Sequence, residues 1–134
     1  MTHSLAMHML DRIDARNPTP LYAQIASRVK LAIAAGELAA GEGLPSVRQL
    51  AARLRINPAT VVQAYRALET EGFVEMRQGA GTFVHELAPA RKAHERRTAA
   101  RRLVRELLTE GGRMGISPQE LAAVLRDELH GDSQ

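Results

Sequence analysis

The feature that most constrains the fold is a pair of helix-start signals separated by one short helix. Ser46 and Gln49 have the spacing of a capping box, and Asn57 with Pro58 combines a strong N-cap with a favoured first helical residue. Apolar residues repeat at helical spacing over residues 47–54, and only three residues separate that segment from Pro58. Two short helices with so tight a connection predict a helix-turn-helix.

A longer helix is predicted before these two. Apolar side chains recur at helical spacing over residues 21–33, and Gly36 is a natural C-terminal cap. Thr19 is expected to cap the N-terminus of this helix, with Pro20 in its first turn. The third helix, which starts at Pro58, is expected to end near Gly72.

The chain after the third helix predicts a β-hairpin. Two β-prone runs, residues 73–77 and 82–85, flank a turn that contains glycine. The predicted fold class is therefore mostly α with a small β-hairpin wing, a winged helix-turn-helix over residues 17–87. Residues 1–16 are interpreted as an N-terminal extension, and residues 88–134 as a two-helix tail.

The tail consists of two amphipathic segments that need a partner surface. A helix is expected over residues 91–110, ending at Gly111 and Gly112, and Ser117 with Glu120 opens a last helix. Two such helices cannot close a core of their own, so they pack either on a second copy or back on the winged domain. The residues predicted to form a dimer interface are Leu103, Val104, Leu107, Leu108, Leu121, Val124, Leu125 and Leu129.

Composition excludes several classes of protein. A chain of 134 residues is too short for a large multidomain enzyme, and it has no apolar run long enough to cross a bilayer. The absence of cysteine excludes disulfides and thiolate metal sites and suits the cytoplasm. The histidines show no metal-ligand spacing, and no catalytic arrangement is recognisable, so we expect neither a cofactor nor an enzyme.

The third helix has an outward face that fits DNA. At 100° per residue, one side carries the residues that must meet the other helices, Val61, Ala64, Tyr65 and Leu68. Ala59, Gln63, Arg66 and Thr70 lie opposite, with Val62 at the edge. In a helix-turn-helix the N-terminal part of this face meets base edges. Gln63 can bind adenine through two hydrogen bonds, and Ala59 and Val62 can contact a thymine methyl group.

Other candidate contacts surround this face. Arg48, near the start of the second helix, is placed to reach phosphate or guanine, although most surface arginines are simply solvated. Asn57 and Thr60 lie at the helix start, where free N–H groups favour phosphate, but capping is the main role expected of Asn57. The wing adds Arg77, Gln78 and Gly79, although such glycines would serve any tight hairpin.

Together these motifs resemble the GntR family of bacterial transcriptional regulators. The start of the third helix and the short tail resemble its YtrA subfamily, whose members are small dimeric repressors often encoded beside ABC-transporter genes. The tail is too short for the ligand-binding or aminotransferase-like domains of larger relatives, which argues against a pyridoxal-phosphate enzyme. The resemblance rests on residues 20–25, 44–51, 56–61, 64–65, 68–69, 71–72 and 77–84.

The resemblance implies DNA contacts at specific positions. They are Arg48, Asn57, Thr60, Gln78 and Gly79. Many family members have arginines at the positions of Pro58 and Val62, so base preference is expected to differ from theirs.

The sequence thus predicts a cytoplasmic, homodimeric repressor that binds a two-fold symmetric operator in double-stranded DNA and does not bind membranes. A low-specificity architectural DNA-binding protein and a protein-interaction adaptor stay as alternatives. The existence of a small-molecule effector is left open, and Met1, Met7 and Met9 are alternative starts.

Overall fold

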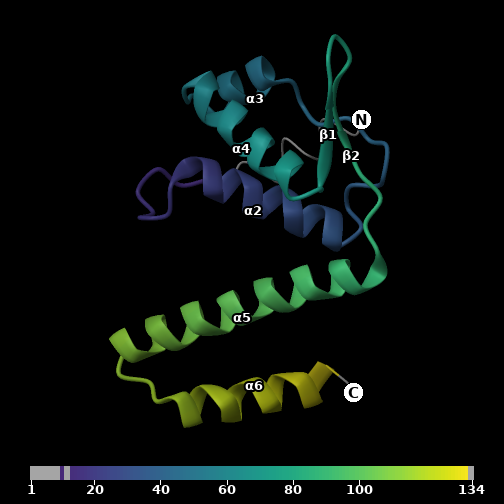
Figure 1. Ribbon diagram of the computed structural model, residues 1–134. Coiled ribbons are helices and arrows are strands. Elements are labelled where there is room, and N and C mark those ends of the chain that lie inside the picture. The colour runs from purple at the N-terminus through teal and green to yellow at the C-terminus, as the bar shows by residue number, and fades with distance from the viewer. Residues whose placement is uncertain (1–9, 11–12, 133–134) are drawn as a thin grey trace. The chain divides into compact units, whose positions relative to one another are not determined.

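The computed structural model describes Leu10 and residues 13–132, and it divides into two compact units, residues 1–96 and 97–134. The alternative starts Met1, Met7 and Met9 lie outside the described residues. The first unit contains α2 (Leu21–Ala34), α3 (Val47–Leu54), α4 (Pro58–Thr70), β1 (Val74–Arg77) and β2 (Gly81–Val84), in that order (Figure 1). The predicted winged helix-turn-helix is confirmed.

The N-terminus of α2 differs from the prediction. Pro20 is the N-cap residue, and no side chain caps the helix, so the expected cap by Thr19 is wrong. Thr19 acts through its backbone instead: its N–H donates to the side-chain oxygen of Asn17 (2.9 Å), and its carbonyl accepts from Gln24 Nε2 (2.9 Å). The Asn17 side chain forms the turn that leads into the helix, because asparagine readily hydrogen-bonds the backbone two residues ahead.

The segment before α2 is hydrogen-bonded to α2. The backbone N–H of Asp14 donates to Gln24 Oε1 (2.9 Å), and Gln24 Nε2 donates to the Asp14 carbonyl (2.8 Å). Leu10 is buried in the core, and Ile13 packs against it. Leu10 therefore contributes to the core, although it lies in the segment interpreted from the sequence as an extension.

The helix-turn-helix has the predicted caps. The N–H of Gln49 donates to Ser46 Oγ (3.0 Å), and the N–H of Ser46 donates to Gln49 Oε1 (3.0 Å), which completes the capping box of α3. Arg55 ends α3 in the left-handed region at φ 57°. The Asn57 side chain then accepts from the N–H of Ala59 (2.9 Å) and caps α4. The tight turn between α3 and α4 thus depends on one non-glycine residue with positive φ.

The hairpin is extended by a further segment, residues 41–44, which hydrogen-bonds to β2. β1 and β2 pair antiparallel, from Val74 opposite Val84 to Arg77 opposite Gly81. Along the other edge of β2, the N–H of Leu44 donates to the Thr82 carbonyl and the N–H of Val84 donates to the Glu42 carbonyl, each at 2.8 Å. Because a two-stranded hairpin is marginal on its own, this extra pairing over residues 41–44 supports the wing.

α4 lies at the centre of the first unit, where it contacts α2, α3 and β1. Tyr65 and Phe73 are the largest of the fully buried side chains. Apolar residues of α2, α3 and both strands complete one contiguous core. The residues predicted to be buried on α4 are all in this core, which confirms the periodicity.

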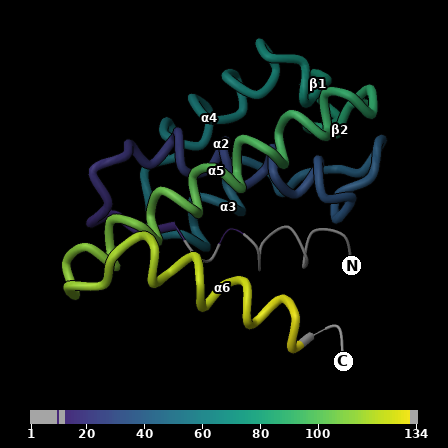
Figure 2. The backbone as a smooth tube through the Cα atoms, turned by 90° about the horizontal axis from the view of Figure 1, so that it is seen from below, coloured from purple at the N-terminus to yellow at the C-terminus, as the bar shows by residue number. Residues whose placement is uncertain are grey.

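The second unit begins within α5 (Pro89–Arg113) and contains α6 (Pro118–Asp132). In this unit α5 and α6 run antiparallel (Figures 1 and 2). The predicted end of α5 at Gly111 is wrong, because the helix continues through both glycines and ends before Gly115, which has the positive φ of 77°. A Cβ atom at Gly111 would lie 2.6 Å from Leu121 Cδ1, so this glycine lets α6 approach closely.

The capping box of α6 is as predicted. The N–H of Glu120 donates to Ser117 Oγ, and the N–H of Ser117 donates to Glu120 Oε1, each at 3.1 Å. Within the described part of the chain, no helix is long and apolar enough to cross a membrane.

Candidate nucleic-acid interface

α4 presents a solvent-exposed face opposite the core. Val62 and Thr60 are half-buried at its edge. The exposed side chains of the helix include all four that were predicted to point outward, namely Ala59, Gln63, Arg66 and Thr70. The structure therefore offers the predicted surface to a partner, with the amide of Gln63 in the middle of the helix.

The N-terminus of α4 is fixed by Asn57. Its side-chain oxygen is used to accept from the N–H of Ala59, and its carbonyl accepts from the N–H of Thr60 (2.9 Å). The expected capping role is confirmed. Contact of Asn57 and Thr60 with phosphate stays a prediction.

Arg48 lies in the first turn of α3, next to the capping box. Its side chain is exposed, whereas Leu50 and Ala51 on the same helix are buried against the core. Because α3 contacts α4, Arg48 is presented from the helix that packs beside the exposed face of α4. Its position suits contact with a strand of DNA, since arginine can bind phosphate or guanine through two hydrogen bonds.

A buried hydrogen bond joins α4 to the entry of α3. Tyr65 is fully buried, and its hydroxyl donates to the Pro45 carbonyl (2.7 Å). Burial raises the pKa of Tyr65, because the charged phenolate would lose its hydration. The hydroxyl therefore stays a donor and fixes the start of α3 relative to α4.

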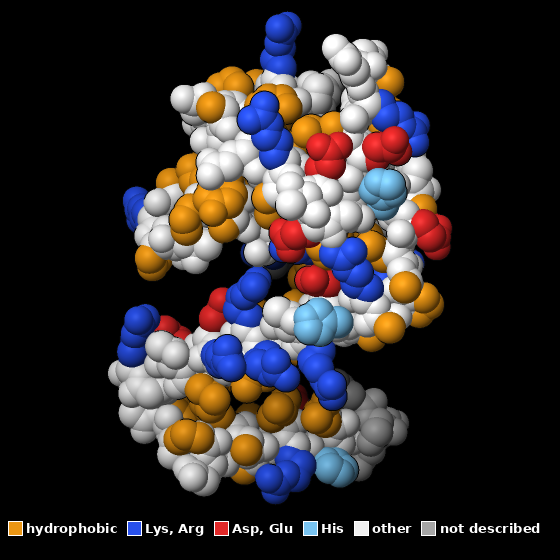
Figure 3. Space-filling view, in the orientation of Figure 1, with side chains coloured by type: hydrophobic (Ala, Val, Ile, Leu, Met, Phe, Trp, Pro, Cys, Tyr) orange, Lys and Arg blue, Asp and Glu red, His pale blue; other side chains and the backbone are white. Residues whose placement is uncertain are grey.

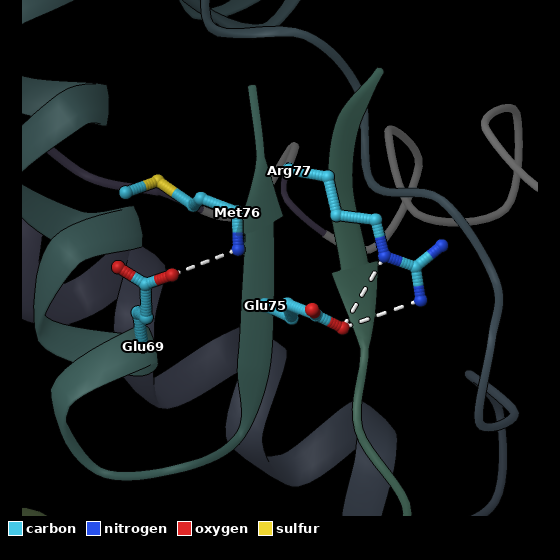
Figure 4. A network of polar contacts seen from close by, with 4 residues as sticks. All are labelled: Glu69, Glu75, Met76 and Arg77. Atoms are coloured by element: carbon cyan, nitrogen blue, oxygen red, sulfur yellow. Dashed lines mark hydrogen bonds and ion pairs between the residues drawn. The ribbon is translucent and has the colours of Figure 1, made fainter. Parts of the chain in front are cut away.

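Arg77, on the wing, forms an ion pair with a glutamate of the same strand. Nε and Nη2 of Arg77 donate to Glu75 Oε2 at 3.3 and 3.2 Å (Figure 4). Its Cζ atom also lies 4.5 Å from the ring centroid of Phe83. Any anion that binds Arg77 must share it with Glu75, a partner that the sequence prediction missed. The signal was available, because residues two apart on a strand share a face.

Strand β1 of the wing is bound to α4. The carboxylate of Glu69 accepts from the backbone N–H of Met76 (2.9 Å; Figure 4). At the tip, Gln78 and Gly79 are exposed, and Gly79 adopts φ 77°, a conformation that favours glycine. The predicted wing residues thus lie on a short turn that is anchored to the same helix as Gln63.

The second unit has an exposed apolar surface on α5 and α6. Figure 3 shows hydrophobic side chains exposed between α5 and α6. Leu121 is half-buried, because it packs on Gly111. The other predicted interface residues are exposed, from 40% at Leu108 to 65% at Leu103, and the sequence prediction missed Met114, which is 67% exposed.

Comparison with known proteins identifies the family. Residues 21–84 match the family model described as "Bacterial regulatory proteins, gntR family". The HTH-type transcriptional repressor YtrA of Bacillus subtilis (strain 168) is 34% identical over 110 residues, which are 82% of this chain and 85% of YtrA. The chain belongs to the GntR family.

Solved GntR-family structures share the fold. A GntR family transcriptional regulator from Listeria monocytogenes superposes with a TM-score of 0.63 at 29% identity, over 85% of this chain and 97% of that one. YtrA from Sulfolobus acidocaldarius gives 0.55 at 35% identity, over 75% and 98%. As a GntR regulator, this protein controls transcription and binds DNA through its winged helix.

The curated relatives are regulators and not enzymes. Among the residues that the structure describes, no three histidine, aspartate or glutamate side chains are grouped so that they could hold a metal ion.

Proposed function

We propose that this GntR protein is a homodimeric repressor that binds a two-fold symmetric operator through α4 and the wing. The observation that carries the proposal is the exposed face of α4, with Gln63 at its centre, together with exposed Arg48 on α3 and exposed Gly79 at the tip of the wing. Similarity to the B. subtilis repressor YtrA supports repression. Resemblance to the YtrA subfamily further suggests a transporter operon as the target.

The exposed face supplies groups that suit base recognition. The Gln63 side chain can both donate and accept, and it matches the N6 and N7 atoms of adenine in the major groove. Ala59 and the edge of Val62 are apolar and fit a thymine methyl group. Arg48, Asn57, Thr60 and Arg66 are proposed to contact the DNA around these bases, with Arg77, Gln78 and Gly79 reaching it from the wing.

The apolar surface of the second unit supports a dimer. Leu103, Leu129 and their neighbours on α5 and α6 form one exposed apolar face, and soluble proteins seldom leave such a face uncovered. A second copy can cover it with the same surface, as two-fold symmetry requires. The α4 helices of the two copies, which act as recognition helices, would then contact half-sites about one DNA turn apart. Bound across a promoter, the dimer would block RNA polymerase.

A shallow cleft is the place we propose for a small-molecule effector. It has a volume of about 410 Å³ and lies in the first unit, between the end of α2, residues 38–40 and residues 85–87. Lys92, in the first turns of α5, also lines it. An effector there would contact both α2 and α5.

Fluorescence anisotropy tests the DNA-binding part of the proposal. The protein is titrated onto its own upstream DNA and onto a scrambled duplex at low and physiological salt. A preference of about a thousandfold or more at physiological salt is expected. Equal, strongly salt-dependent binding to both duplexes would favour an architectural protein, and binding to neither would favour an adaptor.

Substitution of Gln63 tests the recognition face. Gln63→Ala is expected to cost about 1–3 kcal/mol on the preferred site and to relax one base position. Thr70→Ala, at the other end of the exposed face of α4, is the matched control and should leave affinity unchanged. Equal effects of the two substitutions would place the base contacts elsewhere.

Substitution of the exposed tail leucines tests the dimer. Leu107→Glu combined with Val124→Glu should give a monomer in sedimentation velocity, because two charges would be buried in the interface. Both residues are exposed in the chain, so the variant is expected to fold. Thr109→Glu, an exposed polar position on the same helix, is the control. A dimer in the double variant would place the interface elsewhere.

A further inference from the structure

Two arginines at the start of α5 bind the C-terminal ends of α4 and α2. Arg91 Nη2 donates to the carbonyl of Glu71, the residue that caps α4. Arg96 Nη1 donates to the carbonyl of Ala34, the last residue of α2 (2.9 Å). Carbonyls at helix C-termini lack partners within the helix and lie at the negative end of its dipole, so a cationic donor is favoured at both.

The Arg91 side chain also fits closely around the turn after α4. Its Cζ atom lies 4.6 Å from the ring centroid of Phe73, which is fully buried. A Cβ atom at Gly72 would come within 3.2 Å of Arg91 Nη1, so the guanidinium occupies the space that this glycine leaves. Lys30 holds the same turn from α2, because its Nζ atom pairs with the Glu71 carboxylate at 2.7 Å.

We infer that Arg91 and Arg96 are positioning residues that fix the separation of the two recognition helices in the dimer. The inference rests on the proposed function, in which the apolar surface of the second unit joins two copies. α5 is one continuous helix from Pro89 to Arg113 (Figure 1). Side chains that hold the first turns of α5 to the end of α4 therefore connect the DNA-binding face of α4 to the apolar surface proposed to form the dimer.

The physical consequence concerns the spacing of half-sites. When one recognition helix is bound, the second meets its half-site at an effective concentration set by the stiffness of the connection. A stiff connection favours one spacing strongly, whereas a loose one binds each spacing more weakly and tolerates several. Neither arginine lies on the exposed face of α4, so their loss should leave the half-site sequence unchanged.

The test selects binding sites from a random DNA library with the full-length protein and sequences them. Wild type is compared with Arg91→Met combined with Arg96→Met, and with the control Arg101→Met combined with Arg105→Met, whose arginines are exposed on the same helix. Methionine keeps much of the aliphatic stem but has no N–H donor. Sedimentation velocity establishes the mass of each protein, and anisotropy measures its affinity.

Wild type and control are expected to enrich paired half-sites at one spacing. The Arg91/Arg96 variant should stay dimeric and enrich the same half-site at several spacings, with affinity for the wild-type spacing reduced about tenfold. Arg91→Lys with Arg96→Lys, which keeps both charges but loses the planar fork, is run in parallel. The lysine variant should also enrich half-sites at several spacings. It provides the test if the methionine variant does not fold.

Different results overturn the two ideas separately. A folded, dimeric Arg91/Arg96 variant that keeps the single wild-type spacing overturns the inference, as does a variant that has become monomeric. Wild type that enriches no paired half-sites overturns the proposed symmetric operator itself.

Discussion

The hydrogen bond from Tyr65 to Pro45 gives the sharpest stability prediction. Tyr65→Phe keeps the buried ring and removes one hydroxyl, so no cavity of a full side chain is created. The cost is the lost bond and an unsatisfied carbonyl at Pro45, which is itself fully buried. Leaving such an acceptor unpaired costs about 1–3 kcal/mol, and we expect about 2 kcal/mol because water cannot easily replace the hydroxyl. For a unit of this size, Tm should fall by about 8–16 °C.

Urea denaturation followed by circular dichroism measures this loss. Tyr22→Phe is the matched control, since Tyr22 is half-buried and its hydroxyl makes no hydrogen bond to the residues that the structure describes. Its free energy of unfolding should change by less than about 0.5 kcal/mol. If Tyr65→Phe is as stable as wild type, the bond does not contribute as argued, and the link between α4 and the entry of α3 must be attributed to apolar packing alone.

Three further predictions concern pH, capping and the tail. Because burial raises the pKa of Tyr65, the unfolded chain releases that proton first, and stability should fall as pH rises above about 10. Urea midpoints should show a shallower fall in Tyr65→Phe, and equal slopes would contradict this. Ser46→Ala should cost about 1 kcal/mol in the same assay, and an unchanged midpoint would mean that the capping box adds nothing. A Cβ atom added at Gly112 meets no atom within 4 Å, so Gly112→Ala should raise the free energy of unfolding of the tail helices by up to about 1 kcal/mol. Gly111→Ala must displace Leu121 and should therefore raise it less. Equal gains from the two substitutions would refute the close packing of α6.

Local signals in the sequence predicted most of the elements. The capping boxes at Ser46 and Ser117 and the asparagine-proline start of α4 each involve neighbours a few residues apart, so their geometry follows from spacing alone. The buried stripe of α4 was equally readable, because its period of 3.6 residues reflects a single core. The predicted cap by Thr19 was wrong because the side chain of Asn17, two residues earlier, forms the turn before α2.

Contacts between distant segments were not predictable. Gly111 resembles a helix end by composition, but it lies inside α5 and packs against Leu121 ten residues later. Nothing in the local sequence distinguishes Arg91 from the other arginines of the tail, because its contact with Glu71 forms only when the turn after α4 is folded beside it. At the candidate interface, the exposure of Gln63 followed from helical periodicity, whereas the engagement of Arg77 by Phe83 depends on pairing between two strands.

The hydrogen bonds between residues 41–44 and β2 limit where the chain can change length. One residue inserted between Gly41 and Leu44 would shift the pairing with Thr82 and Val84, and side chains that now face the core would turn to solvent. An insertion at the wing tip, residues 78–80, would meet no such constraint, because the tip is exposed. A peptide tag placed at the tip should therefore change what the wing contacts and leave the unit folded, whereas the same tag in the segment before α3 should unfold it.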